Sequence, residues 1–540
     1  MTDEIRYRLL DEPLLSTADS SGRRREVFSL PALYAALVRG AVDDFPALRP
    51  HQRHVWHAFL VQVGALALHH SGLTELPDDA AAWRALLLAL TPDDPDGAAW
   101  ALVAPAARPA LLQAPVTDST EGWDLVSSPD ELDMLATSKN HDVKRAVIAN
   151  ARPEHWIYAL VSLQTQEGYG GATKHGVSRM NTGKGNRPGV GVVVAGGASA
   201  RFARDVKGSL QLRSSILADY EFFKSTGGLG LLWLEPWNGV QPLGPTSLDP
   251  FFVEVCRRVR VIDRGGRLCA VATGTAKPKV LGQRIAADSL RGNMGDLWTP
   301  VATDEIGPKA YTLSTPGFTY DRMRALLLPT VDDQIRRAPL QVVLPTDPDE
   351  GLVLVARGLV RGDVTEGYYE REIPVSKVLR QFLTTTPTDL AANCAKDRAS
   401  DVGIFVKRVL RPALQLAFTG APREQTGARE KDKTLSSRVR AGVSAFERIV
   451  DAEFFADLNA ELEILDDPTA RDAVRGTWLA RLREFGRDIL DNVLESAPSA
   501  AMRRYRTRVR ARSRFEAAFR HHFGHRVTDA GGTAPAPEVA

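Results

Sequence analysis

Residues 168–204 read GYGGATKHGVSRMNTGKGNRPGVGVVVAGGASARFAR, and the interpretation of the whole chain starts from this stretch. It contains ten glycines, six lysines or arginines and one histidine, but no acidic residue, although 66 of the 540 residues in the chain are acidic. Glycine allows positive φ and leaves backbone N–H groups unshielded, and added positive charge suits an anion such as phosphate. The stretch therefore predicts a polyanion-binding loop, with a long basic surface loop as the alternative.

The phosphate-binding motifs of nucleotide enzymes are absent from this stretch. A P-loop requires GxxxxGK[ST] between a strand and a helix. Gly171 and Gly176 have the required spacing, but no lysine follows the second glycine. The dinucleotide pattern GxGxxG is not met at any offset that follows a strand. These failures exclude the usual NTP and dinucleotide sites and leave other polyanions.

Composition places the chain among ordinary globular proteins, with 44% hydrophobic and 25% charged residues. Because the net charge is only +2, nucleic-acid affinity must come from local patches. The first residues carry acids where a signal peptide needs basic ones, and no apolar run is long enough to span a bilayer. We therefore expect a cytoplasmic protein. Three scattered cysteines, Cys256, Cys269 and Cys394, indicate neither a disulfide framework nor a four-ligand zinc site.

Residues 1–395 carry mixed strand and helix signals and predict a large α/β domain with β-hairpins. Strands are expected at 7–10, 27–29, 230–239, 340–344, 352–360 and 368–375, and helices at 81–90, 154–164 and 209–223. Trp233 and Trp237 are expected in the core. The spacing of His51, His54 and His57 places them progressively around one helix, and no carboxylate or cysteine beside them completes a set of metal ligands. This favours a partly exposed helical face over a metal site.

Residues 396–527 predict a C-terminal four-helix bundle, so the fold class is α+β, and residues 528–540 predict a disordered tail. The last helix contains seven arginines between Arg503 and Arg514. On a helix, Arg503, Arg506, Arg510 and Arg514 form one stripe, which suits a phosphate backbone. A strict alternation of arginines also fits a strand, and a solvated face is the alternative without a ligand.

Catalytic motifs are not found: GxSxG, HExxH and a Cys-His signature are all missing. The pair His141-Asp142 leaves one enzymatic alternative, a metal-dependent nucleic-acid-processing enzyme. That chemistry requires further ligands that the neighbouring sequence does not supply. The surrounding polar and basic residues favour a loop that touches nucleic acid, with the helix at 154–164 leading directly into the glycine-rich stretch.

The order of short motifs along the chain resembles the CasA family, the large subunits of type I-E CRISPR Cascade surveillance complexes. The motifs are LLDEP (9–13), TSKNHDVK (137–144), GYGG with KHG (168–176), WLEPWNG (233–239), GDLWTP (295–300) and the ARGLVRG-TEGYYER hairpin (356–371), followed by the helical bundle. The resemblance extends over about residues 4–525.

This resemblance implies a non-enzymatic subunit without a cofactor or metal, which reads the protospacer-adjacent motif (PAM) of duplex DNA mainly from the minor groove. It implies that the subunit promotes R-loop formation and recruits a helicase–nuclease, within a complex of crRNA, backbone and small subunits. In such a complex the protein reads a short motif, and base pairing with the guide RNA reads the rest of the target sequence. Minor-groove readout distinguishes A·T from G·C but does not distinguish A·T from T·A, so a tolerant motif is expected.

Site residues carried over by position fall into four groups. The glycine loop corresponds to Gly168, Gly170, Gly171, Lys174 and His175; the lysine finger to Lys277 or Lys279; the wedge hairpin to 361–367, with Arg361 and Thr365; and the complex-docking loop to Thr137, Ser138, Lys139, Asn140 and His141. The wedge of the family carries glutamine, and this tip has none, so Arg361 or Thr365 would substitute. The bundle would contact small subunits and the target strand.

Overall fold

The structure, a computed structural model of the 540-residue chain, divides into two compact units. It describes residues 4–133, 148, 150–168, 170–181, 187–282, 290–360, 367–384, 389–419, 433–496 and 501–527, apart from the side chains of 433–434 and 501–504. The first unit comprises Met1–Phe318 and Gln334–Thr385. The second comprises Thr319–Asp333 and Thr386–Ala540.

The first unit mixes helices with small sheets. Its helices are α1 (Leu30–Val38), α2 (Arg53–His70), α3 (Ala80–Ala89), α5 (Pro153–Thr165), α6 (Gly197–Asp219) and α8 (Lys377–Thr384). Its strands are β1 (Arg6–Arg8), β2 (Leu15–Ala18), β3 (Arg25–Phe28), β4 (Ala101–Val103), β5 (Asp124–Val126), β6 (Gly189–Val193), β7 (Leu229–Leu231), β8 (Leu248–Val253), β9 (Arg258–Arg264), β10 (Arg267–Thr273), β11 (Val301–Asp304), β12 (Gly307–Ala310), β13 (Ile335–Arg336), β14 (Val353–Val360) and β15 (Gly367–Pro374). With the helices of the second unit, these elements confirm the predicted α+β class.

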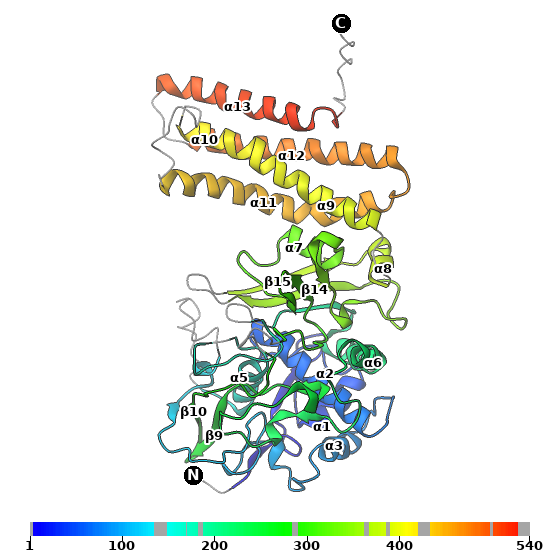
Figure 1. The fold of residues 1–540 in the computed structure, drawn as a ribbon, viewed down its shortest axis with the longest axis vertical. Helices are drawn as coiled ribbons and strands as arrows, with labels where there is room; N and C mark the ends of the chain where they lie inside the picture. The colour runs from blue at the N-terminus through cyan, green and yellow to red at the C-terminus, as the bar shows by residue number, and fades with distance from the viewer. Residues whose placement is uncertain are drawn as a thin grey trace. The chain divides into compact units, whose positions relative to one another are not determined.

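Helix α2 forms the centre of this unit: α3, α5 and α6 pack against it, and α1 packs against α3 and α6 (Figure 1). Its sequence is apolar on every side, and such a helix is stable only when it is buried. All residues from Ala58 to Leu68 are buried. Gly64 faces α6, where a Cβ would lie 3.4 Å from the Phe202 ring, so this glycine permits the close approach of the two helices.

Helix α6 begins twelve residues before the helix predicted at 209–223 and ends at Asp219, so both predicted bounds are wrong. Gly196 and Gly197 have φ of +110° and +68°, which makes the turn into the helix possible. A Cβ at Gly197 would lie 2.1 Å from an Asp43 carboxylate oxygen. These two glycines therefore form the turn that starts α6 and do not belong to one long loop. Glycine is needed there because the turn has positive φ and lies close to Asp43.

Strands β14 and β15 form the predicted hairpin, with antiparallel pairs from Val353–Pro374 to Val360–Gly367. Strand β6, from the second half of the glycine-rich stretch, pairs with the other edge of β14. The strand predicted at 340–344 is wrong: Pro339–Gln341 is a short 3-10 helix, and Leu340 and Val343 are buried without strand pairing. The apolar run at 340–344 reflects burial, and a short buried helix and a short buried strand can both have such a run.

The remaining strands form small sheets. Strands β2 and β3 make a hairpin, whereas β1 pairs with β4, so the strands predicted at 7–10 and 27–29 belong to two different sheets. Strands β5, β10 and β9 form a three-stranded antiparallel sheet. In the region predicted as a strand at 230–239, only β7 is extended, and it pairs in parallel with β8. Trp233 and Trp237 are buried, as predicted.

The second unit consists of helices that lie side by side in Figure 1. They are α7 (Tyr320–Leu327), α9 (Asp389–Ile404), α10 (Arg411–Thr419), α11 (Lys433–Leu462), α12 (Pro468–Ser496) and α13 (Ala501–Phe523). A π-helical turn, Phe405–Leu410, joins α9 to α10 without a break. The arginine-rich segment is helical, which settles the helix or strand alternative in favour of the helix.

Phe405 organises the core of this unit. Its ring stacks on Phe446 of α11 at 5.0 Å and meets Phe515 and Phe519 of α13 edge-on. A Cβ at Gly486 of α12 would lie 2.6 Å from the Phe405 ring, so glycine there lets α12 pack against it. The apolar residues at i, i+3 and i+4 along these helices therefore meet at one aromatic centre.

Candidate nucleic-acid interface

The glycine loop forms a tight turn that faces open space. The Gly170 N–H donates to the Lys174 carbonyl at 2.7 Å, and the Lys174 N–H donates to the Gly171 carbonyl at 3.0 Å. Gly171 has φ of +129°, a conformation that favours glycine. A Cβ at Gly171 would meet no atom within 4 Å, so the space beside this backbone is open to a ligand. The Gly170 backbone and the Lys174 side chain are exposed.

A second loop lies directly against the glycine loop. The Thr275 N–H donates to the Thr173 carbonyl at 2.9 Å, and a Cβ at Gly274 would lie 2.9 Å from the Thr173 Cβ. The Ala276 and Lys277 N–H groups both donate to the Gly239 carbonyl, which closes this loop around the WLEPWNG turn. The structure thus brings together two segments that are about 100 residues apart in sequence, each carrying an exposed lysine.

The two lysines proposed as the finger have opposite environments. Lys277 is exposed. Lys279 is 1% exposed, its Nζ donates to the Glu235 carbonyl at 2.8 Å, and it lies 5.4 Å from the Trp237 ring centroid. Burial lowers the pKa of Lys279 to about 7. Of the two candidates for the finger, Lys279 is therefore not on the surface, because its side chain turns inward and donates to a carbonyl of the WLEPWNG turn.

His175, the last residue carried over to the glycine loop, is also buried. Burial lowers the pKa of its imidazole, so it is neutral at pH 7. Gly168 is buried as well, and its carbonyl accepts from the Arg257 guanidinium at 2.9 Å. The described residues of the loop thus divide into two anchored ends and a centre in which Gly170 and Lys174 are exposed and Gly171 is partly exposed.

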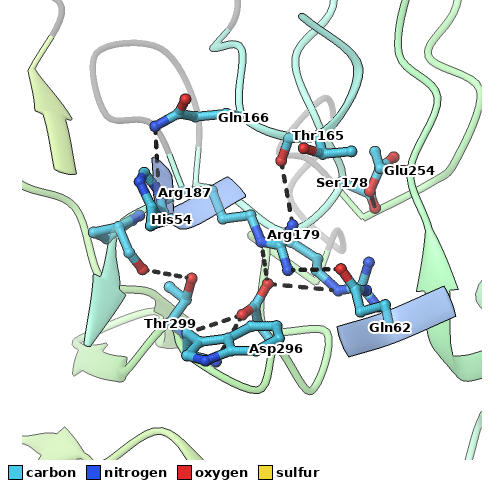
Figure 2. Close-up of polar contacts among 12 residues, drawn as sticks. His54, Gln62, Thr165, Gln166, Ser178, Arg179, Arg187, Glu254, Asp296 and Thr299 are labelled. Carbon is cyan, nitrogen blue, oxygen red and sulfur yellow. Dashed lines mark hydrogen bonds and ion pairs between the residues drawn. The ribbon is translucent and has the colours of Figure 1, made fainter. Parts of the chain in front are cut away.

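Asp296 anchors the chain on both sides of residues 182–186 (Figure 2). Its carboxylate accepts from Arg187 Nε at 2.5 Å and lies 3.6 Å from Arg179 Nε. Its other oxygen accepts from the Trp298 and Thr299 N–H groups of the GDLWTP motif. Although burial alone would raise the pKa of Asp296, Arg187 and Arg179 hold it below its ordinary value. Asp296 of the GDLWTP motif therefore anchors the glycine-rich stretch to the core.

The basic residues of the stretch 168–204 are mostly structural, so its interpretation as one basic surface loop is wrong. Arg179, Arg187 and Arg204 are buried. Arg204 makes a bidentate ion pair with Asp347, at 2.8 and 2.9 Å, and also contacts Asp205. Each pairs with an acid from outside the stretch, and a local count of acids does not detect such partners. Lys174 remains exposed, and Lys184 lies outside the described residues.

Three groups of predicted site residues cannot be placed. Arg361 and Thr365, Thr137 to His141 together with Asp142, and the side chain of Arg503 lie outside the described residues. The bases of two of these segments are described. Val360 pairs with Gly367 at the hairpin, and the Ile148 N–H donates to Asp130, which is also bound to Arg49.

His51, in the 3-10 turn before α2, and His54 and His57 of α2 each have a partner from a distant segment. His51 Nε2 lies 2.7 Å from an Asp133 oxygen and His57 Nε2 lies 2.8 Å from an Asp205 oxygen. His54 Nε2 lies 3.2 Å from the Arg187 carbonyl oxygen. The partly exposed face predicted for them is wrong for His51, which is buried. Among the described residues, no group of three His, Cys, Asp or Glu side chains could hold a metal ion.

The arginine stripe of α13 lies opposite the buried side of that helix. Ala511, Phe515 and Phe519 are buried, whereas Arg506, Arg510 and Arg514 are exposed. Arg506 and Arg514 make no hydrogen bond or ion pair with any part of the chain that the structure describes. Glu516, the acidic residue that follows the stripe in α13, is bound by Arg483 and Arg487 of α12. The stripe is thus more basic than its sequence neighbourhood indicates.

Solved structures of CRISPR-associated proteins share this fold over nearly the whole chain. Thermus thermophilus CasA (Cse1) is 15% identical with a TM-score of 0.62, covering 96% of this chain and 100% of that chain. Acidimicrobium ferrooxidans Cse1 is 16% identical with a TM-score of 0.61, covering 98% and 100%. Thermobifida fusca Cse1 is 13% identical with a TM-score of 0.61, covering 97% and 99%.

The chain therefore has the fold of CRISPR-associated proteins of the CasA (Cse1) type. The resemblance found in the sequence motifs is confirmed at the level of the fold. No protein-family model and no curated protein sequence matches the chain. No helix within the described ranges combines the length and apolarity needed to cross a membrane.

Proposed function

We propose that this chain is the large, non-catalytic subunit of a type I-E crRNA-guided surveillance complex and recognises the PAM in duplex DNA. Gly170 and Gly171 approach the minor groove with their backbone, Lys174 and Lys277 contact its floor or edge, and Lys279 is structural. The subunit acts in the cytoplasm and promotes R-loop formation, after which a helicase–nuclease is recruited.

The observation that carries this proposal is the hydrogen bond between the Thr275 N–H and the Thr173 carbonyl, at 2.9 Å. It joins the two loops that the family resemblance assigns to motif reading. An exposed glycine backbone can approach bases closely, and two neighbouring lysines supply positive charge. Both loops are anchored from below by buried groups, namely Arg257 on Gly168 and Lys279 on Glu235, so the surface is preorganised.

The other predicted regions have subsidiary roles in this proposal. Residues 137–141 dock into the rest of the complex, and the hairpin tip with Arg361 and Thr365 separates the strands. The stripe of Arg506, Arg510 and Arg514, continued by Arg503, holds phosphates of the target DNA. Phosphate contacts carry affinity without sequence information, whereas contacts in the groove specify the motif.

The test uses the assembled complex and a duplex library with randomised bases next to the protospacer. The complex with wild-type subunit should enrich a subset of sequences at those positions. Lys174→Ala with Lys277→Ala should flatten this enrichment, and Gly170→Asp should abolish it by placing a carboxylate against the groove. The complex should still assemble in each case.

Lys224→Ala is the matched control, because this lysine is also exposed and belongs to the same unit but lies outside both loops. It should leave the enrichment unchanged. Equal enrichment with the Lys174/Lys277 double variant would show that the two loops do not read the motif. His141 and Asp142, the residues of the enzymatic alternative, lie outside the described residues, so no observation favours that alternative.

A further inference from the structure

A cationic pocket lies in the first unit between α2, α6, β6 and β14, and none of its lining residues belongs to the two motif loops. Its polar walls are His54 and His57 of α2, Arg201 of α6, Arg357 of β14 and Arg187 just before β6. Trp298 forms an aromatic wall. The cavity volume of the pocket is about 30 Å³. It is therefore a small site lined by three arginines.

Two of these arginines already have acidic partners. Arg187 pairs with Asp296, and Arg357 Nε donates to Glu370 at 2.6 Å. Asp205, the acid in the pocket wall, is occupied by His57 and by Arg204, each at 2.8 Å. The acids around the pocket are thus committed to other cations.

Arg201 has no such partner. No hydrogen bond or ion pair joins it to any described residue, and its Nε is inaccessible to solvent and unpaired. The His54 Nδ1 in the same wall is likewise inaccessible and unpaired. Burial lowers the pKa of Arg201 to about 10 and that of His54 to about 3, so at pH 7 the arginine is charged and the histidine is neutral. An unpaired, partly buried charge is costly unless a ligand compensates it.

Glycines keep the pocket open. Gly189 and Gly191 lie two residues apart on β6 and so face the same side of the strand. A Cβ at Gly189 would lie 3.1 Å from the His54 ring, and a Cβ at Gly191 would lie 3.3 Å from the Trp298 ring. Larger side chains at these positions would take up the space between the arginines.

We propose that this pocket binds one tetrahedral oxyanion of the phosphate class, with Arg201 as its principal ligand. Guanidinium groups match the oxygen geometry of phosphate and sulfate, and Arg201 has no ion pair with a described residue that such an anion would have to displace. The ligand is a free anion or the phosphate of a nucleotide. This site is independent of PAM recognition, and it gives Arg201, Gly189 and Gly191 of the glycine-rich stretch a role in anion binding.

The test is isothermal titration calorimetry of the full chain with inorganic phosphate, sulfate and AMP, against chloride at equal ionic strength. Saturable binding with a Kd below about 1 mM is expected for phosphate and sulfate. Arg201→Gln should weaken it at least about tenfold, as loss of a charge-assisted contact does. Lys207→Gln, an exposed cation on the same helix, should leave the Kd unchanged.

Two further measurements keep the result interpretable. Gly191→Ala retains every charge but narrows the pocket, and it should also weaken binding. Without anion, Arg201→Gln should unfold at a temperature no lower than wild type, because it removes an uncompensated charge. Tighter binding of AMP than of phosphate identifies a nucleotide as the ligand, and equal binding identifies the free anion. No saturable binding up to about 10 mM, or an equal Kd for Arg201→Gln and wild type, would overturn the proposal.

Discussion

The Thr275 N–H donates to the Thr173 carbonyl at 2.9 Å, and this bond joins the glycine loop to the lysine loop. Gly274 makes the contact possible, since a Cβ there would lie 2.9 Å from the Thr173 Cβ and 3.2 Å from its carbonyl oxygen. Lys174 and Lys277 therefore project from two loops held together by their backbones. The candidate interface is one composite surface.

Gly274→Ala should separate the two loops. The added Cβ requires a backbone shift, and we expect a loss of about 1–2 kcal/mol in the free energy of unfolding together with weaker PAM discrimination. Urea unfolding followed by tryptophan fluorescence measures the first effect. Gly244→Ala is the control in the same unit, because it has φ of −77° and only an ordinary contact at 3.7 Å. Equal stability of the two variants would contradict this interpretation.

Asp296→Asn should destabilise the first unit strongly. The substitution leaves Arg179 and Arg187 buried without their carboxylate, and breaking a buried ion pair on one side costs about 3–5 kcal/mol. Asp219→Asn removes an exposed partner of Arg336, with both side chains about half exposed, and should cost less than about 1 kcal/mol. Urea midpoints of the two variants should therefore differ clearly, and similar midpoints would argue against the anchoring role of Asp296.

The stability of the first unit should depend on the ionisation of Lys279. Its pKa is about 7 in the folded chain against an ordinary value of 10.5, so between these values the unfolded chain binds more protons. The free energy of unfolding should then rise with pH from about 7 to about 10, by at most about 1.4 kcal/mol per pH unit. Lys279→Met removes this contribution. Unfolding of both proteins at pH 6.5 to 9.5 measures the difference, and parallel pH profiles would exclude a shifted Lys279.

The arginine stripe of α13 should contribute salt-dependent affinity without sequence preference. Replacing Arg506 and Arg514 by Ala in the assembled complex should reduce the magnitude of the slope of log K against log salt by about 2, one contact for each arginine. The PAM enrichment should persist. Arg440→Ala, an exposed arginine of α11, serves as the control. Fluorescence anisotropy with labelled duplex at several KCl concentrations checks this, and an unchanged slope would remove the stripe from the DNA contacts.

The sequence alone determined those features that depend on local patterning. Periodicity identified α3, α5 and the long helices of the C-terminal bundle but not α7, and strand alternation with a Gly-containing turn identified the β14–β15 hairpin. The order of motifs indicated the CasA family, whose fold the chain has. Such signals work because the face that an element buries repeats with the period of that element.

Only the tertiary structure decided which basic residues are available to a ligand. Arg179, Arg187 and Arg204 lie in the same stretch as Lys174, yet their carboxylates come from Asp296 and Asp347, more than 100 residues away. Lys277 and Lys279 are two residues apart, and one is exposed while the other caps a buried carbonyl. Ion pairing, burial of a single side chain and the contact between Thr173 and Thr275 depend on partners that are distant in sequence. The composition of a short stretch does not identify partners from distant segments, so these contacts are known only from the folded structure.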